Sequence, residues 1–190
     1  LSLFAASKAF AADAAPSVRP ANRAEAVAII EQARSIVTPQ GIERLEKVRI
    51  GGIDQWISIR GTDRRNPVLL VLHGGPGYTS MPLAWWNARG WEDFFTVVHW
   101  DQRAAGRTHL LTGAEEVAPT LTIDRMYADA EEVAAWVRRE LDHERIIVMG
   151  HSWGTWLGLR LARERPGWLH AYVGVAQLTD MRENERRNWR

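Results

Sequence analysis

Three short stretches of the chain are mostly apolar and lack the alternation of apolar and polar residues that marks a strand with one wet face. They are residues 67–72, 95–100 and 145–149. Strands that helices cover on both faces of a parallel sheet have this character. The pattern therefore predicts three buried parallel strands, and a shorter apolar run at residues 171–176 predicts one more.

An antiparallel hairpin is predicted before these strands. Residues 45–50 and 53–60 are joined by Gly51 and Gly52, which permit a tight turn. The second segment alternates between apolar and polar side chains over residues 53–59, as a half-exposed strand does.

Apolar residues recur at three-to-four spacing in residues 22–37, 122–141 and 153–163, which predicts three helices. The first lies outside the main fold. The second has Thr122 as its N-cap and connects two parallel strands, and the third ends before Pro166.

The order of these elements is a hairpin followed by alternating strands and helices. This order predicts an α/β fold with a doubly wound, mostly parallel sheet, in which ligands bind at the carboxyl ends of the strands. We assign residues 21–180 to this core and residues 181–190 to the start of a helical cap or a tail.

The first 20 residues are Ala-rich and have two interpretations. Ala9-Phe10-Ala11 fits the small-x-small rule of a signal-peptidase site, and the first residue is not Met, so the segment is either the remnant of an export signal or a disordered tail. The first interpretation predicts an exported protein and the second a cytoplasmic one. No stretch approaches the roughly 18 uninterrupted apolar residues of a membrane span.

Composition narrows the classes of partner. The 24 basic and 23 acidic residues nearly cancel and are spread along the chain, so no long-range field favours nucleic acid or an anionic membrane. Without cysteine the chain has no disulfide, thiolate metal site or cysteine nucleophile, and the scattered histidines suggest neither a metal nor an organic cofactor. A small peptide or another small molecule is the expected substrate.

Gly150-His151-Ser152-Trp153-Gly154 lies directly after a predicted buried strand and directly before a predicted helix. Gly-x-Ser-x-Gly in this context places a serine on a strained turn with its hydroxyl exposed at the sheet edge, and the two glycines let the backbones pass closely. The helix N-terminus is aimed at the same point, where it would stabilise a developing oxyanion. We therefore predict Ser152 as a nucleophile.

Two further loops follow predicted strands. Residues 73–77 read His-Gly-Gly-Pro-Gly, a run whose backbone N–H groups are unshielded, and Gly75 with Trp153 would supply the two amides of an oxyanion hole. In residues 101–103 an Asp and an Arg either pair with each other or bond loop backbone. The residues assigned to shaping these loops are His73, Gly74, Pro76, Gly77, Asp101, Gln102, Arg103, Gly150 and Gly154.

In their order and spacing, these three motifs resemble the proline iminopeptidase (prolyl aminopeptidase) branch of the α/β-hydrolases, over roughly residues 45–176. The resemblance implies a serine hydrolase that forms an acyl-enzyme at Ser152 and releases an N-terminal residue, often proline, from short peptides. The chain departs from this branch at Ala104 and His151, where the branch usually has glycine. Related hydrolases cleave esters or other amides, and an esterase is the alternative. Dehalogenases and epoxide hydrolases use an aspartate nucleophile in place of this serine.

A serine nucleophile also needs a histidine base and a carboxylate that orients it. The chain order of this family puts both after the nucleophile, which argues against His73 as the base and against Asp101 as the acid. After Ser152 the chain has only His170 and Asp180, and neither is at the expected strand end. We therefore expect the last strands, the cap, the acid and the base to be missing from these 190 residues. A non-catalytic binding scaffold is the remaining alternative.

Five of the ten tryptophans flank the motifs, where their rings would either wall a substrate pocket or pack in the core. They are Trp85, Trp86, Trp91, Trp153 and Trp156.

Overall fold

The computed structural model describes residues 19–189, so the Ala-rich start with its signal-like site lies outside the described residues. Contacts divide the chain into one unit that ends at Ala33 and a larger unit that begins at Arg34. Helix α1 (Arg23–Arg34) contains no buried residue. No helix in the described part is long and apolar enough to cross a membrane.

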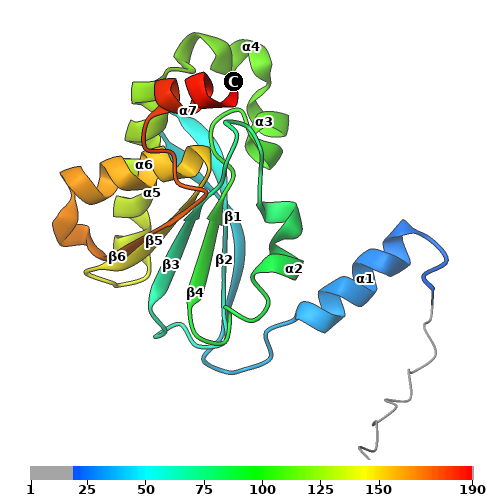
Figure 1. Ribbon diagram of the computed structural model, residues 1–190. Helices are drawn as coiled ribbons and strands as arrows, with labels where there is room; N and C mark the ends of the chain where they lie inside the picture. Colours follow the sequence, from blue (N-terminus) through cyan, green and yellow to red (C-terminus); the bar gives the residue numbers. More distant parts are fainter. Residues whose placement is uncertain (1–18, 190) are drawn as a thin grey trace, which may run out of the picture. The chain divides into compact units, whose positions relative to one another are not determined.

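The larger unit is built on one mixed six-stranded sheet with the strand order β1-β2-β4-β3-β5-β6 (Figure 1). β1 and β2 form the predicted antiparallel hairpin, and β2 is also antiparallel to β4. β4, β3, β5 and β6 are parallel, which confirms the predicted fold class. The strands are β1 (Ile42–Ile50), β2 (Ile53–Gly61), β3 (Val68–Leu72), β4 (Thr96–Trp100), β5 (Ile146–His151) and β6 (Leu169–Val175).

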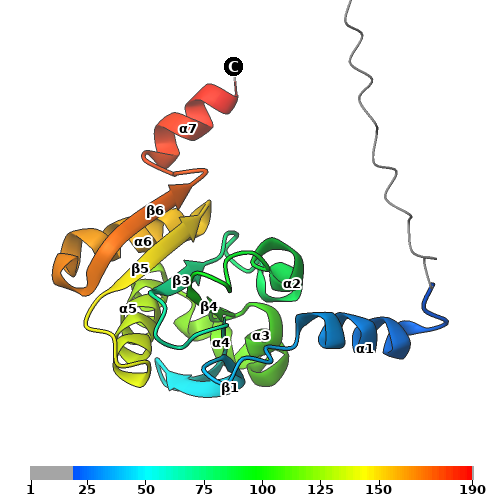
Figure 2. The same cartoon turned by 90° about the horizontal axis from the view of Figure 1, so that it is seen from below.

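Helices α5 (Ile123–Glu140) and α6 (Trp153–Glu164) pack on one face of the parallel strands (Figure 2). Their apolar stripes meet the inward side chains of β3, β4 and β5, and this contact forms the main core. A smaller cluster on the opposite face joins β3 and β4 to Ala88, just after the short helix α2 (Ala84–Asn87). Thr122 caps α5 as predicted, because its hydroxyl accepts a hydrogen bond from the Arg125 N–H at 3.2 Å.

The pattern did not predict several short elements in the connections. They lack enough turns for a helical period to be visible in the sequence. They are η1 (Met81–Leu83), α3 (Gly106–Thr112), α4 (Ala114–Val117), η2 (Ala118–Thr120) and η3 (Pro166–Trp168). The segment assigned to a helical cap or a tail contains α7 (Met181–Asn188), which Asp180 caps.

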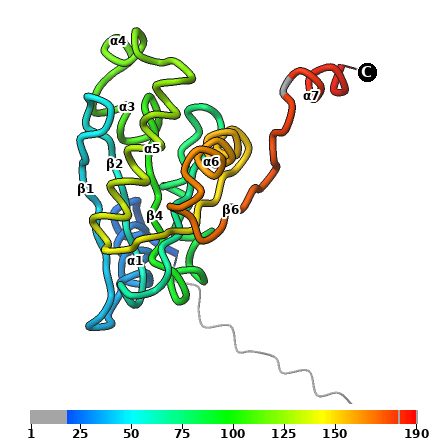
Figure 3. The backbone as a smooth tube through the Cα atoms, turned by 90° about the vertical axis from the view of Figure 1, so that its left-hand side faces the viewer, coloured from blue at the N-terminus to red at the C-terminus, as the bar shows by residue number. Residues whose placement is uncertain are grey.

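The sheet register brings the carboxyl ends of the central strands together. Leu72 at the end of β3 is opposite Gly150 in β5, and Val71 is opposite His99 in β4. The hairpin and β6 lie at opposite edges of the sheet, as the backbone trace in Figure 3 shows. The segments after β3, β4 and β5 therefore leave the same edge, where ligands bind in sheets of this kind.

Candidate functional site

The candidate site is centred on Ser152, the single residue between β5 and α6. Its backbone is left-handed, with φ +49° and ψ −118°, a conformation that costs a non-glycine residue about 1–3 kcal/mol. The surroundings hold it there. The Ser152 N–H donates to the Val175 carbonyl oxygen at 2.9 Å, and the Ser152 carbonyl oxygen accepts from the Thr155 N–H and hydroxyl at 2.9 and 2.6 Å. No described residue hydrogen-bonds the Ser152 hydroxyl, so this group is available at the strand end.

The two flanking glycines allow this turn to be tight. A Cβ atom on Gly154 would lie 2.0 Å from the Leu72 carbonyl oxygen, and one on Gly150 would lie 2.4 Å from the Gly154 carbonyl oxygen. Both distances are far inside van der Waals contact, and both obstacles are backbone. Only glycine therefore lets α6 begin this close to β3 and β5.

The glycine loop at residues 73–77 lies against the Ser152 turn. A Cβ atom on Gly74 would be 3.2 Å from the Ser152 Cβ, and Gly75 has the left-handed φ of +118°. The Gly75 N–H and the N–H of Trp153, the first residue of α6, donate no hydrogen bond to another described residue. The structure thus places the loop that carries the unpaired Gly75 amide against a half-buried serine, whose neighbour Trp153 carries a second unpaired amide. Unpaired backbone amides are groups that a negatively charged oxygen can bind.

His73 is buried inside this loop and is held by neighbours on both sides of its ring. Its Nδ1 is 2.9 Å from the Gly74 carbonyl oxygen, and its Nε2 is 3.2 Å from the backbone nitrogen of Gln102. A carbonyl only accepts and an N–H only donates, so Nδ1 carries the proton and Nε2 accepts. Burial lowers the pKa of His73, which keeps this ring neutral. None of these contacts joins His73 to Ser152.

The Asp-Gln-Arg turn after β4 does not contain the ion pair that was one of the two predicted alternatives. Asp101 accepts hydrogen bonds from the Thr79 hydroxyl and, at 2.8 Å, from the Arg107 N–H. Arg103 instead binds Asp129 on α5, with its Nε 2.8 Å from Oδ2. Bonding to loop backbone, the other alternative, is found for Arg103, whose Nη2 donates to the carbonyl oxygen of Gly51 in the hairpin turn. The backbone N–H that Asp101 binds belongs to the first turn of α3. The two side chains leave the turn in different directions.

Sequence reasoning missed Asp129, although one signal was present. Asp129 lies on the same side of α5 as Met126 and Val133, which belong to the main core. A carboxylate on an apolar stripe is almost never buried unless it is paired, so this position alone predicts a buried partner. Nothing in the sequence says which of the arginines that partner is.

A cavity of about 520 Å³ opens beside the Ser152 turn, on the face of the sheet that carries α2. It meets the turn at Gly74 and His151, and Trp91 is the one tryptophan among its lining residues. Trp153 and Trp156 instead stack on each other at 5.5 Å between ring centres and pack against the main core. The cavity is lined by Val71, His73, Gly74, Tyr78, Ser80, Leu83, Asn87, Trp91, His99, Met149, His151 and Val175.

His99 is the most perturbed group in this lining. It is 5% exposed, its Nδ1 is 3.2 Å from the Ser80 hydroxyl, and its Nε2 is buried without a hydrogen-bond partner among the described residues. Burial, together with the positive charge of Arg34 and the neighbouring His73, lowers the pKa of His99 to about 4. The ring therefore stays neutral near pH 7.

Acidification is expected to destabilise the fold through His99. The unfolded state, with a pKa near 6.5, binds the proton first, so the free energy of unfolding falls as the pH drops from 6.5 toward 4. A shift of this size removes about 3 kcal/mol by pH 4. Urea unfolding of wild type and His99→Leu between pH 7 and pH 4.5 measures the contribution of His99 to the free energy of unfolding. If this free energy fell equally with pH in the two proteins, the lowered pKa of His99 would be contradicted.

The two residues after Ser152 that could serve as base and acid are placed elsewhere. His170 is an exposed residue of β6, and Asp180 caps α7 by accepting a hydrogen bond from the Glu183 N–H at 2.9 Å. Within the described residues, neither a histidine nor a carboxylate hydrogen-bonds the Ser152 hydroxyl. The same residues contain no group of three His, Cys, Asp or Glu side chains that could hold a metal ion.

Comparison with known proteins gives a family match for most of the larger unit. The model of the alpha/beta hydrolase fold matches residues 67–189. A probable aminopeptidase of Bacillus subtilis is 32% identical over 146 residues, which cover 77% of this chain and 45% of that protein. A probable proline iminopeptidase of Streptomyces coelicolor is 38% identical over 112 residues, which cover 56% of this chain and 32% of that protein. The chain therefore spans less than half the length of these two relatives.

Solved structures show the same fold. The proline iminopeptidase of Mycobacterium smegmatis superposes with a TM-score of 0.52 and 30% identity, over 68% of this chain and 42% of that one. A proline iminopeptidase-related protein of Thermus thermophilus superposes with a TM-score of 0.58 and 23% identity, over 77% and 55%. The likeness to the Thermus thermophilus protein is one of fold alone. The Mycobacterium smegmatis structure, together with the sequence relatives, confirms the resemblance that the three motifs indicated.

Proposed function

Because the chain belongs to the α/β-hydrolase family, we propose that it carries the nucleophile and oxyanion hole of a serine hydrolase, with Ser152 as the attacking residue. The observation that carries this proposal is the left-handed backbone of Ser152, which is held between a buried strand and a helix, beside the glycine loop. Strain of this kind persists only where the surroundings impose it, and it is typical of functional positions. A serine in an ordinary turn would have no need of it.

The chemistry follows from the groups at this turn. The Ser152 Oγ attacks a substrate carbonyl carbon while its proton passes to a general base, and the carbonyl oxygen becomes an oxyanion. The N–H groups of Gly75 and Trp153 are the donors that would bind that oxyanion. Collapse of the intermediate breaks the bond to the amine or alcohol, which takes the proton back from the base as it leaves, and an ester remains on Ser152. Water, deprotonated by the same base, then attacks this ester, and Ser152 recovers its proton as the acid is released.

For the substrate, we propose the free N-terminus of a short peptide, from which one residue, often proline, is removed. Relatives named as a probable aminopeptidase and as proline iminopeptidases support this class. The cavity beside the turn also supports it, because apolar side chains such as Val71, Met149 and Val175 line it with a few polar groups. Such a lining suits one small apolar residue.

A non-catalytic binding scaffold is a second candidate. It is favoured by the lack of any contact between the Ser152 hydroxyl and a described histidine or carboxylate. A serine without its base keeps only the part of catalysis that oxyanion binding supplies, and loses several orders of magnitude in rate. If Ser152 is catalytic, we expect these residues to turn over slowly, whereas the scaffold would show no turnover.

The test is covalent labelling with a fluorophosphonate, read by mass spectrometry of the intact chain and its peptides. We expect slow modification of Ser152, its loss in Ser152→Ala, and no change in the control Ser58→Ala, which removes a half-buried serine of β2 that does not line the cavity. Hydrolysis of L-proline p-nitroanilide and p-nitrophenyl acetate by the same variants separates peptidase from esterase activity. Labelling at residues other than Ser152 would contradict the proposal, and no labelling at all would favour the scaffold.

A further inference from the structure

The three residues after β4 contact three different parts of the fold. Asp101 binds the N-terminus of α3, Gln102 binds His73 at the end of β3, and Arg103 binds α5. The turn at residues 101–103 therefore connects the glycine loop to a buried carboxylate on α5. Of the three, only Gln102 contacts the loop directly.

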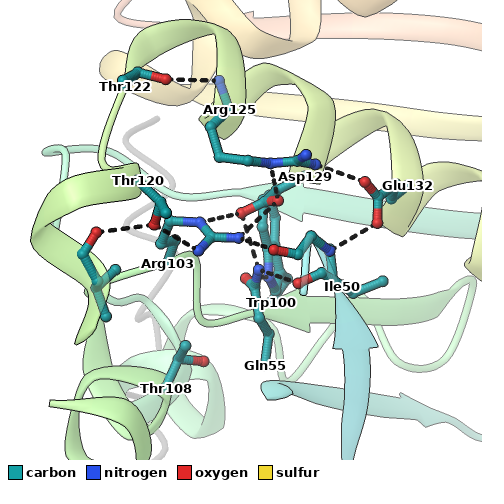
Figure 4. Close-up of polar contacts among 12 residues, drawn as sticks. Ile50, Gln55, Trp100, Arg103, Thr108, Thr120, Thr122, Arg125, Asp129 and Glu132 are labelled. Carbon is teal, nitrogen blue, oxygen red and sulfur yellow. Dashed lines mark hydrogen bonds and ion pairs between the residues drawn. The ribbon is translucent and has the colours of Figure 1, made fainter. Parts of the chain in front are cut away.

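Arg103 is 1% exposed, and four hydrogen bonds hold its guanidinium in place. Its Nε and Nη2 bind the two oxygens of Asp129 at 2.8 and 3.2 Å, its Nη1 binds the Thr120 hydroxyl at 3.0 Å, and its Nη2 also donates to the Gly51 carbonyl oxygen at 2.7 Å. Figure 4 shows the guanidinium between α5, the segment before it and the hairpin turn. A guanidinium fixed in this way also fixes the backbone of its own residue.

Asp129 is held as firmly as Arg103. It is fully buried, and besides Arg103 it accepts from Arg125 Nε at 2.8 Å and from Gln55 Nε2 at 2.9 Å (Figure 4). The hairpin turn lies so close to the Asp129 carboxylate that a Cβ atom on Gly51 would be 2.0 Å from one of its oxygens. Buried ion pairs are a weak source of stability, because desolvation offsets most of their attraction. We therefore attribute to this pair the orientation of the Arg103 side chain and not a gain in stability.

Gln102 transmits that orientation to His73. Its backbone N–H donates to His73 Nε2 at 3.2 Å, and its side-chain Nε2 donates to the His73 carbonyl oxygen at 2.9 Å. The first of these bonds selects the tautomer, because an Nε2 that accepts leaves the proton on Nδ1. Without it, only the Gly74 carbonyl oxygen, which accepts from Nδ1, still favours that tautomer among the described contacts of the ring.

The tautomer of His73 in turn sets the direction of one amide. Protonated Nδ1 donates to the Gly74 carbonyl oxygen at 2.9 Å. The peptide bond between Gly74 and Gly75 is trans, so its C=O and N–H point in opposite directions. Holding the carbonyl oxygen toward the ring therefore turns the Gly75 N–H away from the ring. A proton on Nε2 instead would present a lone pair to that carbonyl and free this peptide to rotate.

We propose that Arg103 and Asp129 are positioning residues that fix the Gly75 N–H in its oxyanion-binding direction, through Gln102 and the tautomer of His73. The inference rests on the proposed function only for what that N–H binds. The connection from Arg103 and Asp129 to the Gly75 N–H lies within this chain and can be measured without substrate.

The test uses nitrogen NMR of the chain labelled with ¹⁵N-histidine and ¹⁵N-glycine, with the signals assigned by His73→Gln and Gly75→Ala variants. Ring ¹⁵N shifts report the tautomer, and the residual dipolar coupling of the Gly75 N–H reports the direction of that bond. In wild type we expect the Nδ1-protonated form. In Arg103→Met and in Asp129→Asn we expect the tautomer ratio to change by about fivefold toward Nε2, the effect of one lost hydrogen bond. We expect the dipolar coupling of the Gly75 N–H to change with it.

Arg125→Met is the matched control. The Arg125 guanidinium binds the same carboxylate, but its other hydrogen bond is to Glu132 on α5 and not to the turn at residues 101–103. It should leave the tautomer and the coupling as in wild type. If Arg103→Met does not fold, Asp129→Asn and Thr120→Val are measured in the same way. Thr120→Val removes the Arg103 Nη1 bond and the local bond of the Thr120 hydroxyl to the Val117 carbonyl oxygen.

Folded Arg103 and Asp129 variants that keep the Nδ1 form would overturn the proposal, as would an equal change in Arg125→Met. Fluorophosphonate labelling separates this failure from that of the proposed function. A shifted tautomer with an unreactive Ser152 would support the positioning role of Arg103 and Asp129 and contradict the proposed hydrolase function. A reactive Ser152 with an unchanged tautomer would support the hydrolase function and contradict the positioning role.

Discussion

Gly154→Ala is expected to destabilise the fold by about 4 kcal/mol or more, which is beyond the usual cost of overpacking. The new Cβ atom would lie 2.0 Å from the Leu72 carbonyl oxygen and 2.8 Å from that of His73. Both obstacles are backbone at the end of the central strand β3, so neither can rotate away as a side chain could. The N-terminus of α6 would have to retreat and take Ser152 with it.

Urea unfolding of Gly154→Ala and of a matched control, Gly167→Ala, measures this effect. A Cβ atom on Gly167 meets nothing within 4 Å, and its φ is outside the left-handed region, so we expect a change of at most about 0.5 kcal/mol. Similar small effects at both positions would show that α6 does not approach β3 this closely.

Arg103→Met is expected to cost about 3–5 kcal/mol, because it removes one partner of a buried ion pair and leaves the carboxylate of Asp129 undercompensated. The double variant Arg103→Met/Asp129→Leu removes both charges and replaces them with apolar side chains. It should be more stable than the single variant, since the cost lies in the unpaired charge and not in the lost attraction.

The pair of variants also separates stability from positioning. In the double variant we expect the free energy of unfolding to recover while the His73 tautomer stays shifted, because the Arg103 side chain no longer holds the turn before it. Chemical unfolding and histidine nitrogen NMR on the same samples measure both. A double variant that is less stable than Arg103→Met would refute the account of the buried charge.

The elements of the sheet could be predicted because each signal was local. Two glycines between alternating segments specify the hairpin, and uninterrupted apolar runs specify β3, β4 and β5. The context of the Gly-x-Ser-x-Gly motif likewise gives a strand, a turn and a helix without tertiary information. The short helices α3 and α4 carry no such period, and they were missed.

Partner choice within the site could not be predicted, for a different physical reason. Arg103 has Asp101 two residues away but pairs with Asp129, 26 residues further along the chain. The choice depends on how α5 is rotated against the sheet, which brings a charged position of its apolar stripe over the hairpin turn. A sequence pattern reports which residues share a face, but it does not report which face meets which neighbour.

The outer edge of β6 has a consequence for handling the protein. Among the described strands β6 pairs only with β5, so its other side presents unpaired N–H and C=O groups over Leu169–Val175. This strand contains no lysine, acidic residue or proline of the kind that usually blocks an open edge, and Val173 and Val175 are exposed on it. Another strand could therefore add to the sheet there. We expect the isolated polypeptide to self-associate as its concentration rises, and a lysine at Val173 to raise its solubility.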